Sequence, residues 1–561
     1  GGKAKLDGST IVDANQDFDM KGDVEVSMQM NAEGAATWKV MTGDNVGKAI
    51  AIVLDDLVYS APIVQNEIGG GRSSISMGSG DLNQQIEEAK DLANLLKAGA
   101  LPAPARIIDE TVVGPSLGRD NVNDGLMSFA VALLLVMIYM VLYYARAGWV
   151  ADLALLVNLF VLLGSLASLQ ASLTLPGIAG IVLTMGMAVD ANVLIYERIR
   201  EELRAGKMLK SAVDLGYKGA LSAIIDSNVT TLITAIILLV FGSGPVRGFA
   251  TTLSIGILTS LFTAIFLSRM VITWRLEHGK SMSFWSGWSK DVFANANFDF
   301  MGKRKYMYIF SSIVIAIGLF SMVTRGFNWG VDFSGGGTYV VKFQEDVRVD
   351  DVRSSLEGAF VSGDGIPSSL NVKTYGDAKQ LKITTNYLVN SREAEADAQV
   401  DAKLASGLEG KGAYEVIESR KVDATISDDI QTSAIYSVTL ALIMIFVYVA
   451  VRFRRWQFGL GGILAIMHDT LFVLGIYSVF YSIVPFSMEI DEAFIAAILT
   501  VVGYSINDTV VVFDRIREYM RDHKRDETVV VFNKAINATL SRTMNTSLTT
   551  LLVLLIIFFF G

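Results

Sequence analysis

Two stretches of the sequence place a carboxylate where an apolar residue is expected. The first, GMAVDANVLIYERIREEL (residues 186–203), carries Asp190 inside an apolar run, and the second, GYSINDTVVVFDRIREYM (residues 503–520), carries Asp508 at nearly the same place. A charged side chain near the centre of a bilayer costs roughly 2.5–3.5 kcal/mol on insertion scales. We therefore expect both carboxylates to be used, either in proton movement or in a permanent ion pair.

The two stretches belong to an internal repeat. When residue 186 is aligned with residue 503, Asp190 falls on Asn507, and the Arg-Ile-Arg-Glu sequences toward the ends of the two stretches coincide. The next helices align with a shift of one residue, which places Asp226 opposite Arg542. Because both halves run in the same direction, these parallel repeats predict two pseudo-symmetric helix bundles that meet at a central interface.

The apolar segments hold more acidic than basic side chains. We count four aspartates in them and one clear cation at similar depth, Arg542. One arginine cannot neutralise four carboxylates, and desolvation favours the neutral form of those left unpaired, which suits them to carrying protons. We predict a proton relay made by Asp190, Asp508, Arg542 and Asp226, with His468, Asp469 and Asn192 as auxiliary polar groups.

In this relay, Asp508 or Asp190 pairs with Arg542 when it is ionised. Protonation from outside weakens the pair and lets one bundle shift against the other, and release of the proton toward the cytoplasm restores the pair.

A purely structural role is the alternative for each polar residue. An intramembrane aspartate can cap a broken helix, and Asp226 and Arg542 lie close enough to charged helix starts for partial snorkelling. Buried asparagines often form hydrogen bonds between membrane helices, which is what we expect of Asn192, Asn228 and Asn545. The remaining charged residues of the two stretches are expected to be solvated cytoplasmic anchors, namely Glu197, Arg198, Arg200 and their counterparts.

Bilayer-length helices must position these residues. The chain has 561 residues, of which 52% are hydrophobic and 19% charged, which is typical of a polytopic membrane protein with soluble parts. A membrane helix needs about 20 mostly apolar residues. Ten segments qualify: 125–145, 153–171, 175–196, 219–241, 248–268, 306–324, 430–451, 457–484, 493–513 and 535–560.

Lysine and arginine collect in the loops on one side of these segments, which predicts that this side is cytoplasmic and that both long polar stretches lie outside. The second polar stretch alternates strand and helix patterns in the order β-α-β-β-α-β, which predicts a ferredoxin-like fold. The first has similar parts and a helix that ends at Gly99. We expect domains at residues 1–124 and 325–429, bundles at 125–275 and 430–561, a cytoplasmic linker at 276–305 and a helix at 306–324.

Several classes of function are disfavoured by the composition. There is no cysteine, only three histidines, and no P-loop spacing, so we expect no catalytic, cofactor or metal site. The formal charge of -10, without a basic stripe, argues against a nucleic-acid partner.

The chain starts without a methionine among strand-like residues and stops inside an apolar run. We expect further sequence at both ends.

These motifs closely resemble the SecD/SecF family of protein-export membrane proteins, in a fused form. The resemblance is carried by GMAVDANVLIYERIREEL and VGYSINDTVVVFDRIRE, and also by KAGALPAPARIIDETVVGPSLG, GVDFSGGGTYVVKF and HDTLFVLG. It implies two bundles of the RND superfamily, two extracytoplasmic ferredoxin-like domains, and a mobile head within residues 1–80. The first membrane helix of the family, the Asp-Leu-Arg-Gly-Gly strand after it and a twelfth helix are not found in the sequence.

The resemblance also implies a function and a location. The family assists the Sec translocase in the bacterial inner membrane and uses the proton-motive force to promote late translocation of secreted polypeptides. Its proton-linked residues fall on Asp190, Asp508 and Arg542, and Asp226 belongs to the family pattern DSNVTT. The implied partners are the SecYEG translocon, preproteins driven by SecA, YajC, a YidC-type insertase and the lipid bilayer.

Three other functions stay open at this point. An RND exporter of small molecules would share the bundles, but it would need far larger extracytoplasmic loops. An intramembrane aspartyl protease could use Asp190 and Asp508, although the Gly-x-Gly-Asp motif is missing. A passive scaffold for the translocon would use the buried charges only for folding.

Overall fold

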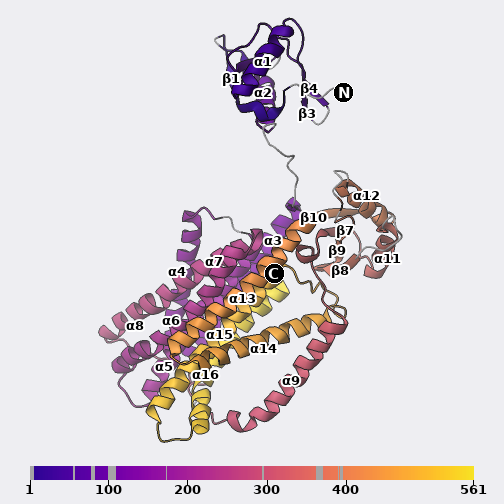
Figure 1. The fold of residues 1–561 in the computed structure, drawn as a ribbon. Coiled ribbons are helices and arrows are strands. Elements are labelled where there is room, and N and C mark those ends of the chain that lie inside the picture. The colour runs from indigo at the N-terminus through magenta and orange to yellow at the C-terminus, as the bar shows by residue number, and fades with distance from the viewer. Residues whose placement is uncertain are drawn as a thin grey trace. The chain divides into compact units, whose positions relative to one another are not determined.

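The computed structural model describes residues 6–560, with the exception of residues 20, 55–56, 78–81, 99–108, 172–173, 294–295, 362–369, 390 and 392–395. The chain divides into two compact units, Gly1–Ile107 and Ile108–Gly561. Figure 1 labels the elements of both units.

The N-terminal unit is a three-stranded sheet covered by helices. Strands β1 (Ile11–Phe18), β2 (Val24–Met30) and β5 (Arg72–Ser76) pair antiparallel in the order β1-β2-β5. Their buried side chains form one core with helix α2 (Leu82–Ala98). The unit also contains the helical turn η1 (Gly8–Thr10), helix α1 (Ala32–Asp44) and a separate hairpin of β3 (Ile52–Leu54) and β4 (Leu57–Ser60).

The ferredoxin-like fold predicted for this first unit is wrong. Its described elements follow the order β1-β2-α1-β3-β4-β5-α2, so the first two strands form a hairpin where a ferredoxin-like fold needs a helical crossover. The tight turn between them contains Gly22 at φ +87°, in the left-handed region that glycine adopts without a steric penalty. The predicted end of α2 at Gly99 lies outside the described residues.

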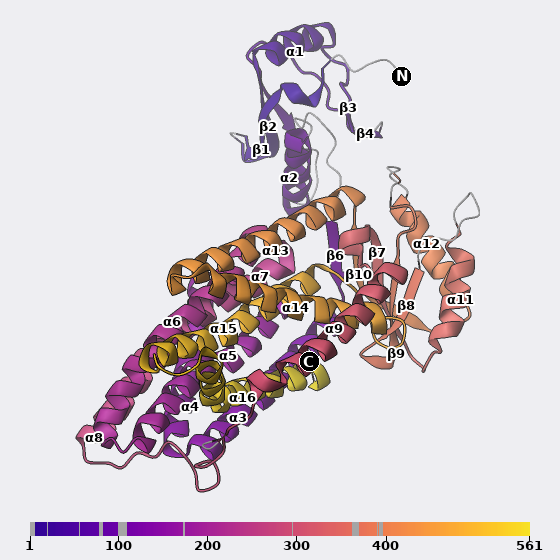
Figure 2. The ribbon, with the colours of Figure 1, turned by 60° about the horizontal axis from the view of Figure 1, so that its bottom comes forward.

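The second soluble domain has the predicted ferredoxin-like fold (Figure 2). Its sheet has the order β6-β10-β7-β9-β8, and all of its strand pairs are antiparallel. Buried residues of the sheet, such as Val341 and Ile383, share one core with Leu356 and Leu404 of its two helices. The elements are β7 (Gly336–Phe343), α11 (Val349–Ala359), β8 (Leu370–Tyr375), β9 (Asp377–Thr385), α12 (Ala396–Leu408) and β10 (Tyr414–Val422).

An additional strand, β6 (Asp109–Val113), extends this sheet at its β10 edge. The strand falls within residues 1–124, which we assigned to the first domain from the sequence. In the structure it pairs with β10 from Asp109 opposite Val422 to Val113 opposite Glu418. The strand leads directly into the first membrane helix, so the second domain also holds the start of the first bundle.

Ten helices in the described part of the chain are long and apolar enough to span a membrane, which confirms the predicted number by length and composition. The fifth span joins α7 and α8 through η2, a π-helical turn. The helices are α3 (Pro115–Tyr144), α4 (Arg146–Ser168), α5 (Leu175–Arg204), α6 (Leu209–Phe241), α7 (Gly244–Phe262), η2 (Thr263–Leu267), α8 (Ser268–Glu277), α9 (Phe300–Thr324), α13 (Ala424–Phe453), α14 (Trp456–Phe480), α15 (Glu492–Asp522) and α16 (Thr528–Phe560).

The two halves interlock around helices α5 and α15. Helix α5 packs against α6, α7 and also α16, while α15 packs against α16 and also α6. The most apolar window of α5 is 89% buried, whereas that of α9, at the edge of the bundle, is 11% buried. Close approach at Gly503 makes this packing possible, because a Cβ there would lie 2.9 Å from the Thr234 hydroxyl of α6.

A chain of polar contacts joins the second soluble domain to both bundles. Arg420 of β10 forms an ion pair of 2.9 Å with Asp332 in the short helix α10 (Val331–Ser334). The other oxygen of Asp332 accepts a hydrogen bond of 2.8 Å from the Glu492 amide at the start of α15. The Glu492 carboxylate in turn accepts hydrogen bonds of 2.6 and 2.7 Å from the amide and hydroxyl of Ser243, which precedes α7.

The N-cap of α15 gives a pH-dependent prediction. Asp491 accepts a hydrogen bond of 2.8 Å from the Phe494 amide. Removal from water raises the pKa of the Asp491 carboxyl, and the nearby acids Asp332 and Glu489 add to the increase, while the hydrogen bond from the Phe494 amide and the charge of Lys382 oppose it. An acid with a raised pKa destabilises the folded state increasingly as the pH rises from the unfolded pKa of about 4 through the raised value, and the penalty vanishes below about pH 4, where both states are protonated.

We expect Asp491→Asn, which keeps the cap, to raise Tm by a few degrees at pH 8 and to match the wild type near pH 4. Thermal unfolding of the purified protein at both pH values measures this. A lower Tm at pH 8 would show that the ionised form of Asp491 stabilises the fold.

Candidate functional site

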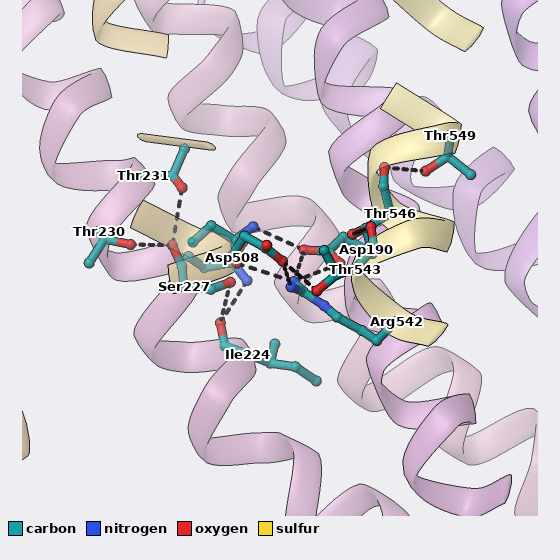
Figure 3. A network of polar contacts seen from close by, with 12 residues as sticks. Asp190, Ile224, Ser227, Thr230, Thr231, Asp508, Arg542, Thr543, Thr546 and Thr549 are labelled. Carbon is teal, nitrogen blue, oxygen red and sulfur yellow. Dashed lines mark hydrogen bonds and ion pairs between the residues drawn. The ribbon is translucent and has the colours of Figure 1, made fainter. Parts of the chain in front are cut away.

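The guanidinium of Arg542 lies between two carboxylates at the interface of the bundles (Figure 3). Arg542 is on α16, and its Nη2 donates to both oxygens of Asp190 on α5, at 3.0 and 2.9 Å. Its Nη1 donates to Oδ1 of Asp508 on α15. The structure therefore brings together three of the four predicted relay residues, from both halves of the repeat.

Neutral side chains complete the cluster. Asn507 donates a hydrogen bond of 2.9 Å to Asp190, and Thr543 donates one of 3.0 Å to Asp508. The Arg542 side chain is 5% exposed and that of Asp190 10%, whereas the Asp508 side chain is 34% exposed. Asp508 is therefore the carboxylate of the cluster that water reaches most easily.

The charge balance of the cluster defines what it can do chemically. Two ionised carboxylates share one guanidinium, so the fully ionised cluster of Asp190, Asp508 and Arg542 carries one uncompensated negative charge. A net charge in a buried environment is costly unless it is paired. One proton on either carboxyl makes the cluster neutral, and it removes one of the acceptors of Arg542. The arrangement can therefore take up and release a proton and change its ion pairs as it does so.

Small cavities flank the cluster on both sides. A cavity of about 20 Å³ adjoins Asp190 and Asn507 and extends toward Thr184 and Thr231. Another of about 40 Å³ is lined by Arg542 and reaches the Arg-Ile-Arg-Glu end of α5. A polar cavity of roughly 10–15 Å³ is large enough for one water molecule, so both have room for water next to the charged groups.

Four ion pairs form at the charged ends of α5 and α15, two of them between the helices and two within them. Arg198 pairs with Glu518 at 2.6 Å and with Glu201 at 3.1 Å, while Arg515 pairs with Glu201 at 2.7 Å and with Glu518 at 2.9 Å. The two arginines are counterparts in the repeat, and so are the two glutamates. We call these four residues the ion-pair ring. Three members of the ring, Arg198, Glu201 and Arg515, line the same 40 Å³ cavity as Arg542.

The prediction that these charged residues are solvated anchors is wrong. The ring arginines Arg198 and Arg515 have side chains that are 20% and 10% exposed. Arg200 is fully buried, where it donates to Glu197 at 2.6 Å and to the Ser289 carbonyl at 2.5 Å. The physical reason is that the two helix ends face each other and the linker, so that the charges pair within the protein rather than with water.

Asp226 lies apart from the cluster and has its own cation. It accepts hydrogen bonds of 2.6 Å from Arg452 Nε and 2.8 Å from the Tyr448 hydroxyl, both on α13. Counting Arg542 as the one clear cation at this depth was therefore wrong. Arg452 lies in the last turn of its helix, beyond the predicted apolar segment, and its long side chain reaches back to the neighbouring helix.

The auxiliary residues form a second network or remain unpaired. His468 Nδ1 lies 2.9 Å from Asp469, Ser505 donates to Asp469 at 2.5 Å, and the Ser311 hydroxyl lies 2.5 Å from His468 Nε2. This network connects α9, α14 and α15 and does not include Arg542. Asn192 is buried, and within the described residues its Oδ1 has no hydrogen-bond partner.

A buried carboxyl of the bundle, Asp152 on α4, was not among the predicted residues. It is 2% exposed, and both of its oxygens lack a hydrogen-bond partner among the residues that the structure describes. The residue lies one position before the predicted apolar segment 153–171, so the count of acids within the apolar segments did not include it. A helix that starts at Arg146 places it inside the bundle.

Comparisons with known families match most of the chain. Residues 97–278 and 403–561 match the family described as protein export membrane protein SecD/SecF, C-terminal. Residues 2–103 match the SecDF P1 head subdomain, and residues 320–347 match the SecD/SecF GG motif. These matches confirm the resemblance found in the sequence motifs.

Individual relatives agree with the family matches. The protein translocase subunit SecDF of Thermus thermophilus is 36% identical over 561 residues, which are 100% of this chain and 73% of that protein. SecDF of Brucella abortus is 34% identical over 562 residues, 99% of this chain and 71% of that protein. The subunit SecD of Rhodothermus marinus is 54% identical over 280 residues, and the match covers 50% of this chain and 44% of that subunit.

Solved structures show the same fold. A crystal structure of SecDF from Thermus thermophilus, described as a translocon-associated membrane protein, gives a TM-score of 0.77 at 36% identity and covers 100% of this chain and 74% of that one. A second structure, of SecDF in a super-membrane-facing form, gives a TM-score of 0.61 at 35% identity and covers 100% of this chain and 73% of that one.

The ion-pair ring predicts energetic coupling between the two halves. A double-mutant cycle with Arg198→Gln and Glu518→Gln should give a coupling free energy of about 1 kcal/mol or more, because both side chains are largely buried and share further partners. Chemical unfolding of the four variants measures this free energy. The control is the pair Arg521 and Asp522 on α15, which is 3.0 Å apart with side chains 73% and 51% exposed, for which we expect little coupling. Equal coupling for both pairs would contradict a stabilising role of the ring.

Proposed function

The chain belongs to the SecD/SecF family of protein-export membrane proteins, and on that premise we propose that it is an accessory subunit of the Sec translocase that uses the proton-motive force to promote late translocation of secreted polypeptides. The observation that supports this proposal best is the position of Arg542 between Asp190 and Asp508. A protonatable cluster at the interface of two bundles is a means of converting proton movement into relative motion of the bundles.

The two carboxylates have different roles in this proposal. Asp190 belongs to the first half, so its bonds from Arg542 and Asn507 hold the two bundles together. Asp508 and Arg542 both belong to the second half, so their bond lies within one bundle. A proton on Asp190 weakens the contact between the bundles, whereas a proton on Asp508 leaves Arg542 entirely to Asp190. Movement of one proton between the two carboxyls therefore switches the interface between a loose state, with Asp190 protonated, and a tight state, with Asp508 protonated.

Three cavities mark a route for the proton. A cavity of about 280 Å³ at the soluble-domain end is lined by Glu492, Asp109 and Asp429. The 20 Å³ cavity beside Asp190 follows, and the 40 Å³ cavity then connects Arg542 to the ion-pair ring. Both cavities touch α6, the outer one at Leu238 and the 20 Å³ one at Thr231. We propose that protons enter at the outer cavity and leave at the ring.

Motion of the interface has a path to the soluble domain. Helix α15 carries Asp508 at its centre and Glu492 at its outer end, where Glu492 binds both Ser243 of the first half and Asp332 beside the sheet. A shift of α15 relative to α7 therefore moves the second soluble domain as well. In the proposal, this movement helps the emerging polypeptide to leave the SecYEG translocon in the bacterial inner membrane. SecA-driven preproteins, YajC and a YidC-type insertase are the further proposed partners.

The geometry argues against an intramembrane aspartyl protease. In such an enzyme two carboxyls share a proton and activate a water molecule between them. Here the space between Asp190 and Asp508 is taken by the Arg542 guanidinium, which bonds to both.

Proton flux through the purified protein in vesicles tests the proposal. We expect Asp508→Asn, Asp190→Asn and Arg542→Ala each to lower the flux by about tenfold or more, because loss of a proton-transfer group typically costs at least this much. Asp469→Asn is the control, since Asp469 lies within an apolar segment but bonds to His468 and Ser505 instead. Its flux should stay within about twofold of the wild type.

The same variants should lose the stimulation of polypeptide export by a proton gradient in membrane vesicles. Unchanged flux in Asp508→Asn or Arg542→Ala would rule out the relay. Normal flux with no effect of the gradient on export would separate proton movement from translocation and favour a passive scaffold.

A further inference from the structure

A cavity of about 300 Å³ opens between α5, α6, η2 and α8, at the end of the bundle where the basic loops lie. Its walls are apolar, formed by Ile195, Leu221, Ile224 and Ile265. Ile265 belongs to η2, a π-helical turn, and such turns are frequent at functional sites. The cavity is separate from the Arg542 cluster, so the inference from it does not depend on the proposed function.

Charged groups gather at this cavity. Arg269 lies over the ring of Tyr217, with its guanidinium carbon 5.6 Å from the ring centre, and it is 3.6 Å from Asp214. Lys218 also lines the cavity and has no ion pair among the described residues. Two cations and one carboxylate line the cavity, which gives it an excess positive charge.

Both cations lie at the level expected for lipid headgroups. Lys218 directly precedes the apolar segment 219–241, and Arg269 directly follows the apolar segment 248–268. Basic side chains at the ends of membrane helices lie at the boundary between the hydrocarbon and the headgroups. The surface beside the cavity is apolar, with Leu221, Ile225 and Phe266 at 40%, 42% and 64% exposure, so an acyl chain can reach its walls from the bilayer.

We propose that this cavity binds a phospholipid with an anionic headgroup. The phosphate lies between Lys218 and Arg269, and an acyl chain covers the apolar walls. Basic pockets between membrane helices recognise anionic headgroups in this way. Each cation near the surface raises the affinity for the lipid by roughly fivefold. Asp214 offsets part of the charge of Arg269, so Lys218 provides the larger share of the attraction for the phosphate. The bound lipid then packs between α6 and α8 and contacts both helices.

Fluorescence quenching in vesicles tests the proposal with the full chain. The chain has no cysteine, so Ile225→Cys gives a single site for a fluorescent label one turn from the cavity wall. Brominated phosphatidylglycerol in a phosphatidylcholine background should quench this label at a concentration about fivefold lower than brominated phosphatidylcholine does. In the double variant Lys218→Gln/Arg269→Gln, both lipids should quench the label equally. In the variant Lys218→Gln/Arg269→Lys, part of the preference for phosphatidylglycerol should return.

Lys210→Gln is the matched control, because Lys210 is exposed on the same helix but does not line the cavity. It should keep the full preference. Quenching by brominated phosphatidylcholine should be the same in every variant, which shows that the label still faces lipid and that the protein is folded. No preference in the wild type, an unchanged preference in the double variant, or equal quenching by phosphatidylethanolamine would overturn the proposal.

Discussion

The rest of the structure depends on one guanidinium that two carboxylates share in a place with little water. Arg542 can donate hydrogen bonds to both Asp190 and Asp508 only if α5, α15 and α16 approach one another closely at the same depth. Glycine brings α15 close to α6 at the same depth, because a Cβ at Gly503 would lie 2.9 Å from the Thr234 hydroxyl. On the other side, Gly186 of α5 packs against α16, where a Cβ would lie 3.6 Å from the Thr550 Cα, in ordinary van der Waals contact.

The repeat is symmetric in the ion-pair ring and asymmetric in the cluster around Arg542. In the ion-pair ring, Arg198 matches Arg515 and Glu201 matches Glu518, so that each arginine pairs with both glutamates. At the centre the equivalence is broken, because Asn507 takes the place of Asp190. A fully symmetric centre would put like charges together in a low dielectric, which is unfavourable. An amide opposite Asp190 instead donates a hydrogen bond to it.

The features that could be predicted best from the sequence are those that hydrophobic periodicity and the cost of burying charge determine. The ten apolar segments and the ferredoxin-like order of the second domain follow from patterns that are local in the chain. The meeting of Asp190, Asp508 and Arg542 followed from the cost of burying charge. Partners of long side chains could not be predicted, since Arg452 reaches Asp226 across a helix interface that no local pattern encodes. The strand Asp109–Val113 has no buried residue, so its alternation carries no signal of the sheet that it joins.

Helix α15 explains how a small change at the cluster can act at a distance. Its 31 residues span about 46 Å at 1.5 Å per residue, with Arg515 and Glu518 near one end, Asn507 and Asp508 in the middle and Glu492 at the other end. Every one of these residues bonds to another helix, and several bond to the other half of the repeat. In the proposed function, a gain or loss of one ion pair at the centre of this helix shifts it and so changes the contacts at both of its ends. In the ion-pair ring each arginine pairs with both glutamates, so the loss of one pair leaves each arginine with a partner.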